Sequence, residues 1–133
     1  MAKPATSTSV VFDASAVLVL LFAEPGAEVA GRYLRDGIIS AANLAEVLAK
    51  LADHGLPLPE AIRAVAMLGL EVVPLTEAQA QRSAELRPVT RALGLSLGDR
   101  ACLALAADRG LPALTADRAW AELKSAVEVV VLR

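Results

Sequence analysis

Short apolar runs alternate with helical segments along this chain, and that alternation most constrains its fold. The runs that read as strands are Val10–Phe12, Gly37–Ser40, Glu71–Leu75, Leu111–Thr115 and Val127–Leu132. Strands that alternate with helices favour a parallel sheet that is covered by helices on both faces. We therefore predict an α/β fold, a three-layer α/β/α single domain with a central parallel sheet of four to five strands.

The helical segments between these strands are marked by their ends. The stretch from Gly55 to Pro59 is a clear break, and Thr76 with Gln79 three residues later predicts a capping box. Pro88 must end or kink the segment that follows, since proline has no backbone N–H to donate. The expected helices cover Ser15–Phe22, Ala27–Arg35, a segment around Glu46, Pro59–Gly69, a long segment from Thr76 to about Leu93, Asp99–Arg109 and Asp117–Leu123.

The length of 133 residues suits one domain with a sizeable core, and 56% of the residues are hydrophobic. Residues 1–9 are small and polar and predict a flexible leader, which leaves 10–133 as the folded domain. The single cysteine, Cys102, excludes an internal disulfide and fits a reducing compartment. The apolar stretch from Ala14 to Ala23 is too short to span a bilayer, so we expect a cytoplasmic protein with no membrane partner.

Four acidic residues fall where a predicted strand ends or just inside a following helix: Asp13, Glu46, Asp99 and Asp117. The carboxyl ends of parallel strands share one edge of the sheet, where open α/β folds bind their ligands. Carboxylates gathered at such an edge repel one another unless a hard cation or protons neutralise them. The pattern therefore predicts a Mg²⁺ or Mn²⁺ site for phosphate-ester chemistry.

Each acid also has an ordinary structural explanation. Asp is a favoured helix N-cap, because its side chain accepts a hydrogen bond from an unpaired amide and its charge suits the helix dipole. Glu46 lies on the polar face of its predicted helix, which suits a solvated surface, together with Asn43, Lys50 and Asp53. Periodicity alone does not separate a solvated glutamate from one that faces a cleft.

Taken together, four segments resemble the PIN-domain ribonucleases, and most closely the VapC toxins of bacterial VapBC toxin–antitoxin pairs. The segments are VVFDASAVLVLLFAEPGAE, ISAANLAEVLAKL, GLSLGDRACLALA and LTADRAWAEL. Their order and spacing carry the resemblance, since a strand that ends in Asp is common by itself. The similarity covers nearly everything from Val10 to Val131, and the extra residues before Val10 are the one clear departure.

The resemblance implies a Mg²⁺-dependent endoribonuclease, in which Mn²⁺ substitutes for Mg²⁺ and a bound ion activates a water for attack on the scissile phosphate. It implies that Asp13, Asp99 and Asp117 are metal ligands, and that Glu46 ligates a second ion or orients the attacking water. The hydroxyl residues Ser15 and Thr115 match family positions and would hold these carboxylates in place.

The remaining expectations concern the substrate and the partners. Asn43, one turn before Glu46, would hydrogen-bond substrate or water, although a local structural role suits Asn43, Ser15 and Thr115 equally well. The net charge of −2 argues against a basic field over the whole surface. Arg100 and Arg118 each follow a site Asp and would contact phosphate or form a structural ion pair. The resemblance also implies an RNA substrate and a cognate VapB-like antitoxin, and the abundant aliphatic helices lead us to expect a homodimer.

Two other readings of the sequence remain open. One is an Asp-based phosphatase or phosphoacceptor with Asp13 as the nucleophile. It lacks a second acid two residues after Asp13, and none of its lysines ends a late strand; these are Lys3, Lys50 and Lys124. The other is a non-catalytic module of the same fold that binds a partner or RNA, in which the acids are helix caps alone.

Overall fold

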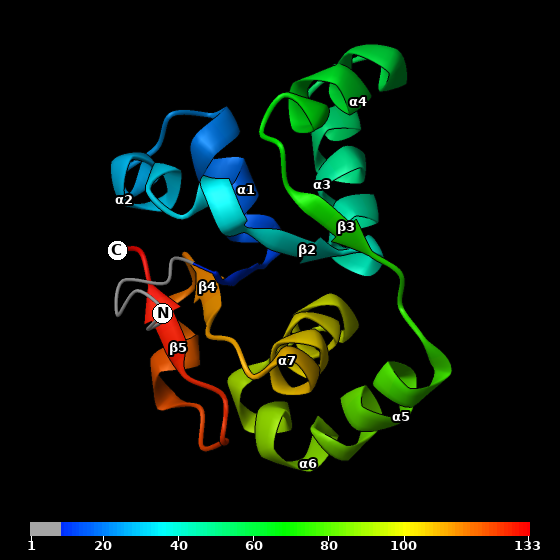
Figure 1. Cartoon of the computed structure of the whole chain (residues 1–133), viewed down its shortest axis with the longest axis vertical. Helices are drawn as coiled ribbons and strands as arrows, with labels where there is room; N and C mark the ends of the chain where they lie inside the picture. The colour runs from blue at the N-terminus through cyan, green and yellow to red at the C-terminus, as the bar shows by residue number, and fades with distance from the viewer. Residues whose placement is uncertain (1–8) are drawn as a thin grey trace, which may run out of the picture.

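A five-stranded parallel sheet organises the computed structural model, which describes residues 9–133 (Figure 1). The strand order is β3-β2-β1-β4-β5, so the first strand lies at the centre. The strands are β1 (Val11–Phe12), β2 (Ile38–Ser40), β3 (Glu71–Val73), β4 (Ala113–Thr115) and β5 (Val129–Val131). The predicted parallel α/β/α fold is confirmed. The predicted leader over residues 1–9 lies, apart from Ser9, outside the described residues.

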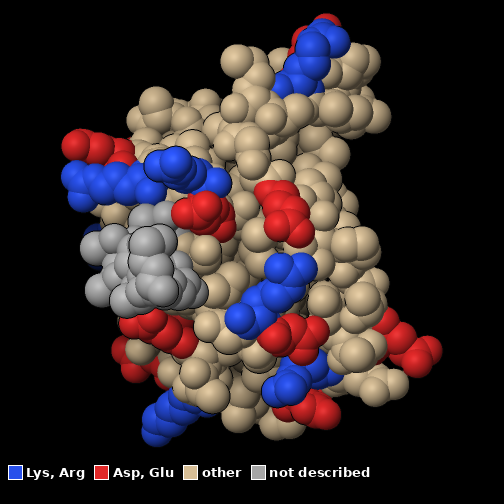
Figure 2. Space-filling model, viewed as in Figure 1, with Lys and Arg blue, Asp and Glu red and all other residues tan. Residues whose placement is uncertain are grey.

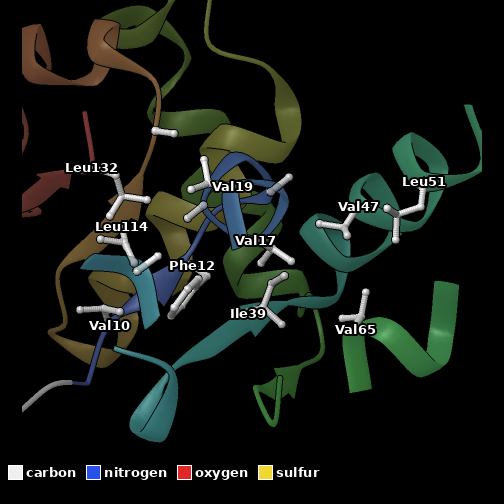
Figure 3. Packing of buried hydrophobic residues seen from close by; sticks show 14 of the residues in the cluster. Val10, Phe12, Val17, Val19, Ile39, Val47, Leu51, Val65, Leu114 and Leu132 are labelled. Atoms are coloured by element: carbon white, nitrogen blue, oxygen red, sulfur yellow. The ribbon is translucent and has the colours of Figure 1, made fainter. Parts of the chain in front are cut away.

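Alternating side chains of the strands build two hydrophobic cores, one on each face of the sheet. Phe12, Ile39 and Leu114 point to the first face, where they pack with residues of α1 (Ala14–Leu21), α3 (Ala41–Asp53) and α4 (Leu58–Ala66) (Figure 3). Their neighbours Val11, Ile38 and Ala113 point to the second face and pack against α7 (Leu97–Arg109). This is the two-residue period that a sheet buried on both faces requires.

Helix α7 lies between the sheet and α5 (Glu77–Glu85), which explains its apolar composition. Its residues from Ala101 to Ala106 are completely buried. Cys102 is among them, as expected for a small core residue, and Trp120 is buried on the same face of the sheet. Within residues 9–133, no helix is long and apolar enough to cross a membrane.

Several predicted helix boundaries are wrong, and capping or proline chemistry explains the main differences. The helix expected from Asp99 begins at Leu97, because Ser96 is its N-cap. The long segment after Thr76 divides into α5, α6 (Arg87–Thr90) and the 3₁₀ turn η2 (Arg91–Leu93), since Pro88 cannot donate the hydrogen bond that would continue α5.

Two further segments that were predicted as α-helices are wholly or partly 3₁₀ turns. The helix expected over Ala27–Arg35 splits into α2 (Ala27–Gly31) and the 3₁₀ turn η1 (Leu34–Asp36), and the last predicted helix is the 3₁₀ turn η3 (Arg118–Glu122). Thr76 caps α5 through the amide of Gln79 as predicted. Gln79 does not complete the capping box, because its side chain is buried and its Oε1 has no partner within the described residues.

Candidate metal centre

Asp13 follows β1 directly and is a buried residue. It lies at the carboxyl ends of the strands, and we call this edge of the sheet, with Asp13, Glu46, Asp99 and Asp117, the acidic edge. Asp13 is the N-cap of α1, and its Oδ1 accepts a 2.8 Å hydrogen bond from the amide of Ala16. The Ser15 hydroxyl contacts both carboxylate oxygens, at 2.8 and 2.9 Å, and the Thr115 hydroxyl donates to Oδ2 at 2.6 Å. Burial raises the pKa of Asp13 to about 6, although these hydrogen bonds oppose the shift.

Thr115 joins the first acid to the fourth. Its Oγ1 accepts a 3.0 Å hydrogen bond from the amide of Asp117 while its hydroxyl donates to Asp13. Asp117 in turn caps η3, because its Oδ1 accepts from the amide of Ala119 at 3.0 Å. Strands β1 and β4 are parallel neighbours, so Asp13 and Asp117 lie at the same edge of the sheet.

Glu46 and Asp99 come to this edge on α3 and α7, which pack against each other. Asp99 is the third residue of α7, where its Oδ2 accepts from the amide of Ser96 at 2.8 Å and its own amide donates to the Ser96 hydroxyl at 3.1 Å. The Glu46 carboxylate lies so close to Gly98 that a side chain at that position would collide with Oε1. The second and third acids therefore meet at the first turn of α7.

Asp99 is the acid that interacts electrostatically with each of the others. Burial is the main cause of the raised pKa of Glu46 and of Asp99. The charge of Asp99 raises the pKa of Asp13 and of Glu46 further, and Asp117 does the same to Asp99. Other interactions oppose part of this rise. Lys50 lowers the pKa of Glu46, and the Ser96 hydrogen bonds and Arg100 lower the pKa of Asp99. The four carboxylates thus form one electrostatic group with Asp99 at its centre.

Three residues for which the sequence suggested either substrate contact or a structural role make hydrogen bonds to the protein's own backbone. Asn43 is completely buried, so its predicted place on a solvated face is wrong, and its Nδ2 donates to the carbonyl of Gly98 at 3.0 Å. Arg100 donates from Nη1 to the carbonyl of Ser83 at 3.3 Å, and Arg118 donates from Nε to the carbonyl of Arg133 at 3.0 Å. Arg100 therefore contacts the backbone of α5, and Arg118, which is exposed, contacts the backbone of the last residue of the chain.

The carboxylate oxygens of the four acids are ligands that suit a hard cation, although they do not surround one position completely. Within the described part of the chain, no three acidic, histidine or cysteine side chains are gathered closely enough to hold an ion by themselves. Mg²⁺ seldom uses a cage made only of protein ligands, because it keeps several waters and binds through one or two carboxylates together with substrate phosphates. In residues 9–133, one oxygen of Asp99 and one of Asp117 accept capping hydrogen bonds, and the second oxygen of each accepts none. Capping and metal binding are therefore compatible at these positions.

Sequence reasoning missed two residues that shape the centre. Ser96 caps α7 and fixes the Asp99 carboxylate, and the Ser-x-x-Asp spacing was a signal that would have revealed it. Gly98 lets Glu46 approach α7, and nothing in the local sequence marks it, because the residue that needs the space lies on another helix.

Comparison with known proteins agrees with this architecture. The family model of the PIN domain matches residues 10–125. A toxin–antitoxin complex from Klebsiella pneumoniae matches with a TM-score of 0.66 and 22% identity over 93% of this chain and 98% of that chain. VapBC2 from Rickettsia felis, solved bound to a DNA fragment from its promoter, has a TM-score of 0.72 and 12% identity over 94% and 99% of the two chains. VapBC-5 from Mycobacterium tuberculosis has a TM-score of 0.62 and 22% identity over 95% and 98%. No protein with a curated description matches the chain.

Proposed function

Since the chain belongs to the PIN domain family, we propose that it is a metal-dependent endoribonuclease and the toxin of a toxin–antitoxin pair. The observation that supports this most is geometric: Thr115 hydrogen-bonds both the Asp13 carboxylate and the amide of Asp117, and the Glu46 carboxylate lies against Gly98, next to Asp99. Helix caps would also lie at the acidic edge, but capping does not explain Glu46, which lies inside α3 with its carboxylate against the first turn of α7. Crowded carboxylates are unfavourable without a cation, and such a cost is typical of functional sites.

In this proposal Asp13, Asp99 and Asp117 hold Mg²⁺ or Mn²⁺, directly or through water. When bound, the ion would supply a water of lowered pKa and neutralise charge on the phosphodiester. Glu46 would orient the attacking water or contribute to a second ion. Ser15 and Thr115 fix the rotamer of the Asp13 carboxylate through their hydroxyl groups, so that its oxygens keep one direction.

The charge distribution suits RNA binding at a small site better than binding along a broad basic surface. Figure 2 shows Lys and Arg interspersed with Asp and Glu on the face turned to the viewer, and the net charge is −2. Phosphate recognition would then depend chiefly on the metal centre. We place this activity in the cytoplasm, where the RNA is found.

The helix pair α3–α4 supports the proposal of an antitoxin partner. It extends away from the sheet at the upper right of Figure 1, and α4 exposes Leu58 and Ile62, which are one helical turn apart. Met67, just after α4, is 88% exposed. An amphipathic helix of a VapB-like antitoxin would cover such apolar side chains, and we propose that it also brings a basic side chain to the acidic edge. The solved complexes named above are toxin–antitoxin pairs, and we further propose that the toxin forms a homodimer.

The nuclease proposal is tested with the purified protein and two substrates, an unstructured RNA and a structured RNA. Each is incubated with Mg²⁺, with Mn²⁺ and with chelator, and the products are separated by length. We expect cleavage with either ion and none with chelator. A protein that cleaves neither RNA, but binds RNA or a partner without Mg²⁺, would instead be a non-catalytic binding module.

A further inference from the structure

Asn43 connects the helix that carries Glu46 to the helix that carries Asp99. Its side chain is completely buried, and its Nδ2 donates a 3.0 Å hydrogen bond to the carbonyl of Gly98. Glu46 lies one turn after Asn43 on α3, and Asp99 directly follows Gly98 on α7. This hydrogen bond therefore spans the contact between the two helices at the level of the acidic side chains.

Gly98 is the other half of this contact. A Cβ atom at position 98 would collide with Glu46 Oε1 and would lie 3.6 Å from Asn43 Nδ2. The Glu46 carboxylate consequently rests against the backbone of the first turn of α7, and a side chain at position 98 would move this carboxylate from its place. The hydrogen bond of Asn43 and the contact of Glu46 therefore meet at the same residue of α7, the one before Asp99.

The hydrogen bond of Asn43 is not an efficient way to stabilise the fold. Asn43 Oδ1 is buried and has no hydrogen-bond partner within residues 9–133, so the amide is only partly satisfied. The carbonyl of Gly98 lies inside α7, where it can accept the intrahelical bond from the residue four positions later. A buried amide that is half satisfied gains little net stability, which points to a role in geometry instead.

We infer that Asn43 is a positioning residue, whose hydrogen bond to Gly98 holds the Glu46 carboxylate beside Asp99 in readiness for a divalent cation. The inference rests on the proposed metal-dependent function. It gives Asn43 no contact with RNA or with the ion, and so replaces the role expected from the sequence. Mutation of a residue that orients a metal ligand typically costs about 10- to 100-fold in metal affinity.

The test is a Mn²⁺ titration of metal-free protein, in which free Mn²⁺ is measured by electron paramagnetic resonance. The variants are Asn43→Ala, which removes the hydrogen bond, and Gly98→Ala, which displaces Glu46 but leaves Asn43 intact. Gln79→Ala is the matched control, since Gln79 is also a buried amide with an unpartnered oxygen, on α5. Melting temperatures of all four proteins are recorded in chelator.

We expect Asn43→Ala and Gly98→Ala to weaken Mn²⁺ binding by about 10- to 100-fold, while Gln79→Ala binds as tightly as the wild type. The melting temperature of Asn43→Ala in chelator should fall no further than that of the control. Wild-type Mn²⁺ affinity in Asn43→Ala, whatever the affinity of Gly98→Ala, would overturn the inference and leave the proposed function standing. A wild-type protein that binds no Mn²⁺ would overturn the proposed function itself, and the inference with it.

Discussion

The hydroxyl of Thr115 donates a 2.6 Å hydrogen bond to Oδ2 of Asp13, and so joins the carboxyl ends of β4 and β1. The same oxygen of Thr115 accepts from the amide of Asp117. One side chain therefore fixes the direction of the first acid and the backbone of the fourth. The pair shows how the central strands of the sheet impose an arrangement on acids that are far apart in sequence.

Thr115→Val removes this hydroxyl with little change of volume. We expect the free energy of unfolding to fall by about 1–3 kcal/mol, because a buried carboxylate loses a donor and the amide of Asp117 loses its acceptor. The stabilisation gained on adding Mg²⁺ should fall as well. Urea unfolding in chelator and in Mg²⁺ measures both effects. Thr90→Val is the control, since Thr90 is equally buried and its hydroxyl donates to the carbonyls of Leu86 and Arg87. Identical behaviour of the two variants would count against the role of Thr115.

The raised pKa of Asp13 predicts how stability depends on pH. Its pKa is 3.8 in a model peptide and about 6 in the folded protein, so between these values the folded state binds more protons than the unfolded state. The free energy of unfolding should therefore decrease as pH rises through this window, by up to ~3 kcal/mol from this group. The raised pKa values of Glu46 and Asp99 act in the same direction.

Asp13→Asn isolates the contribution of Asp13 to this pH dependence, because Asn stays neutral and can still cap α1. Urea unfolding of the wild type and of this variant in chelator, from pH 4 to pH 7, should give a shallower decrease for the variant. Parallel curves for the two proteins would show that the Asp13 carboxylate does not titrate in this range.

Glu46→Gln tests repulsion most cleanly, since Glu46 is inside α3 and caps no helix. Removing one negative charge beside Asp99 should leave the melting temperature of the metal-free protein unchanged or raise it, and should weaken the stabilisation by Mg²⁺. Asp53→Asn, an exposed change on the same helix, is the control and should leave the Mg²⁺ response intact. A lower melting temperature with an unchanged Mg²⁺ response would mean that Glu46 is not part of the metal centre.

The toxin proposal predicts an effect on growth. Expression of the wild-type chain alone should slow the growth of a bacterial host, and expression of Asp13→Asn to the same protein level should not. Co-expression with a neighbouring gene that encodes a small DNA-binding protein should restore growth, because the partner would cover the acidic edge. Equal growth in all cultures, with intact protein present, would contradict the proposal.

The fold was largely predictable because its strands are short and the three central ones, β2, β1 and β4, are buried on both faces. Consecutive apolar residues such as Val11 and Phe12 serve the two cores in turn, and the intervals between strands accommodate helices. The positions of Asp13 and Asp117 at helix starts followed from capping chemistry. The strand order did not follow from local pattern, because each parallel pairing joins distant segments.

The contact between α3 and α7 was the part of the site that the sequence concealed. Asn43 has the periodicity of a surface residue, yet it is buried because Gly98 of another helix lies against it. A hydrophobic pattern reports which face of a helix is apolar, and it gives no information about a polar contact between two helices that are distant in sequence.

If four acids form one catalytic metal centre around Asp99, then Asp99→Asn should lose Mg²⁺-dependent RNA cleavage, and the rate of that cleavage is the measurement. Asn keeps an acceptor for the amide of Ser96, so α7 should remain capped and the melting temperature in chelator should not fall. We predict that cleavage falls by orders of magnitude, because the attacking water loses its activation, while the Asp53→Asn control cleaves at the wild-type rate. Wild-type cleavage by Asp99→Asn, or cleavage that persists in chelator, would show that these acids do not form a catalytic metal centre.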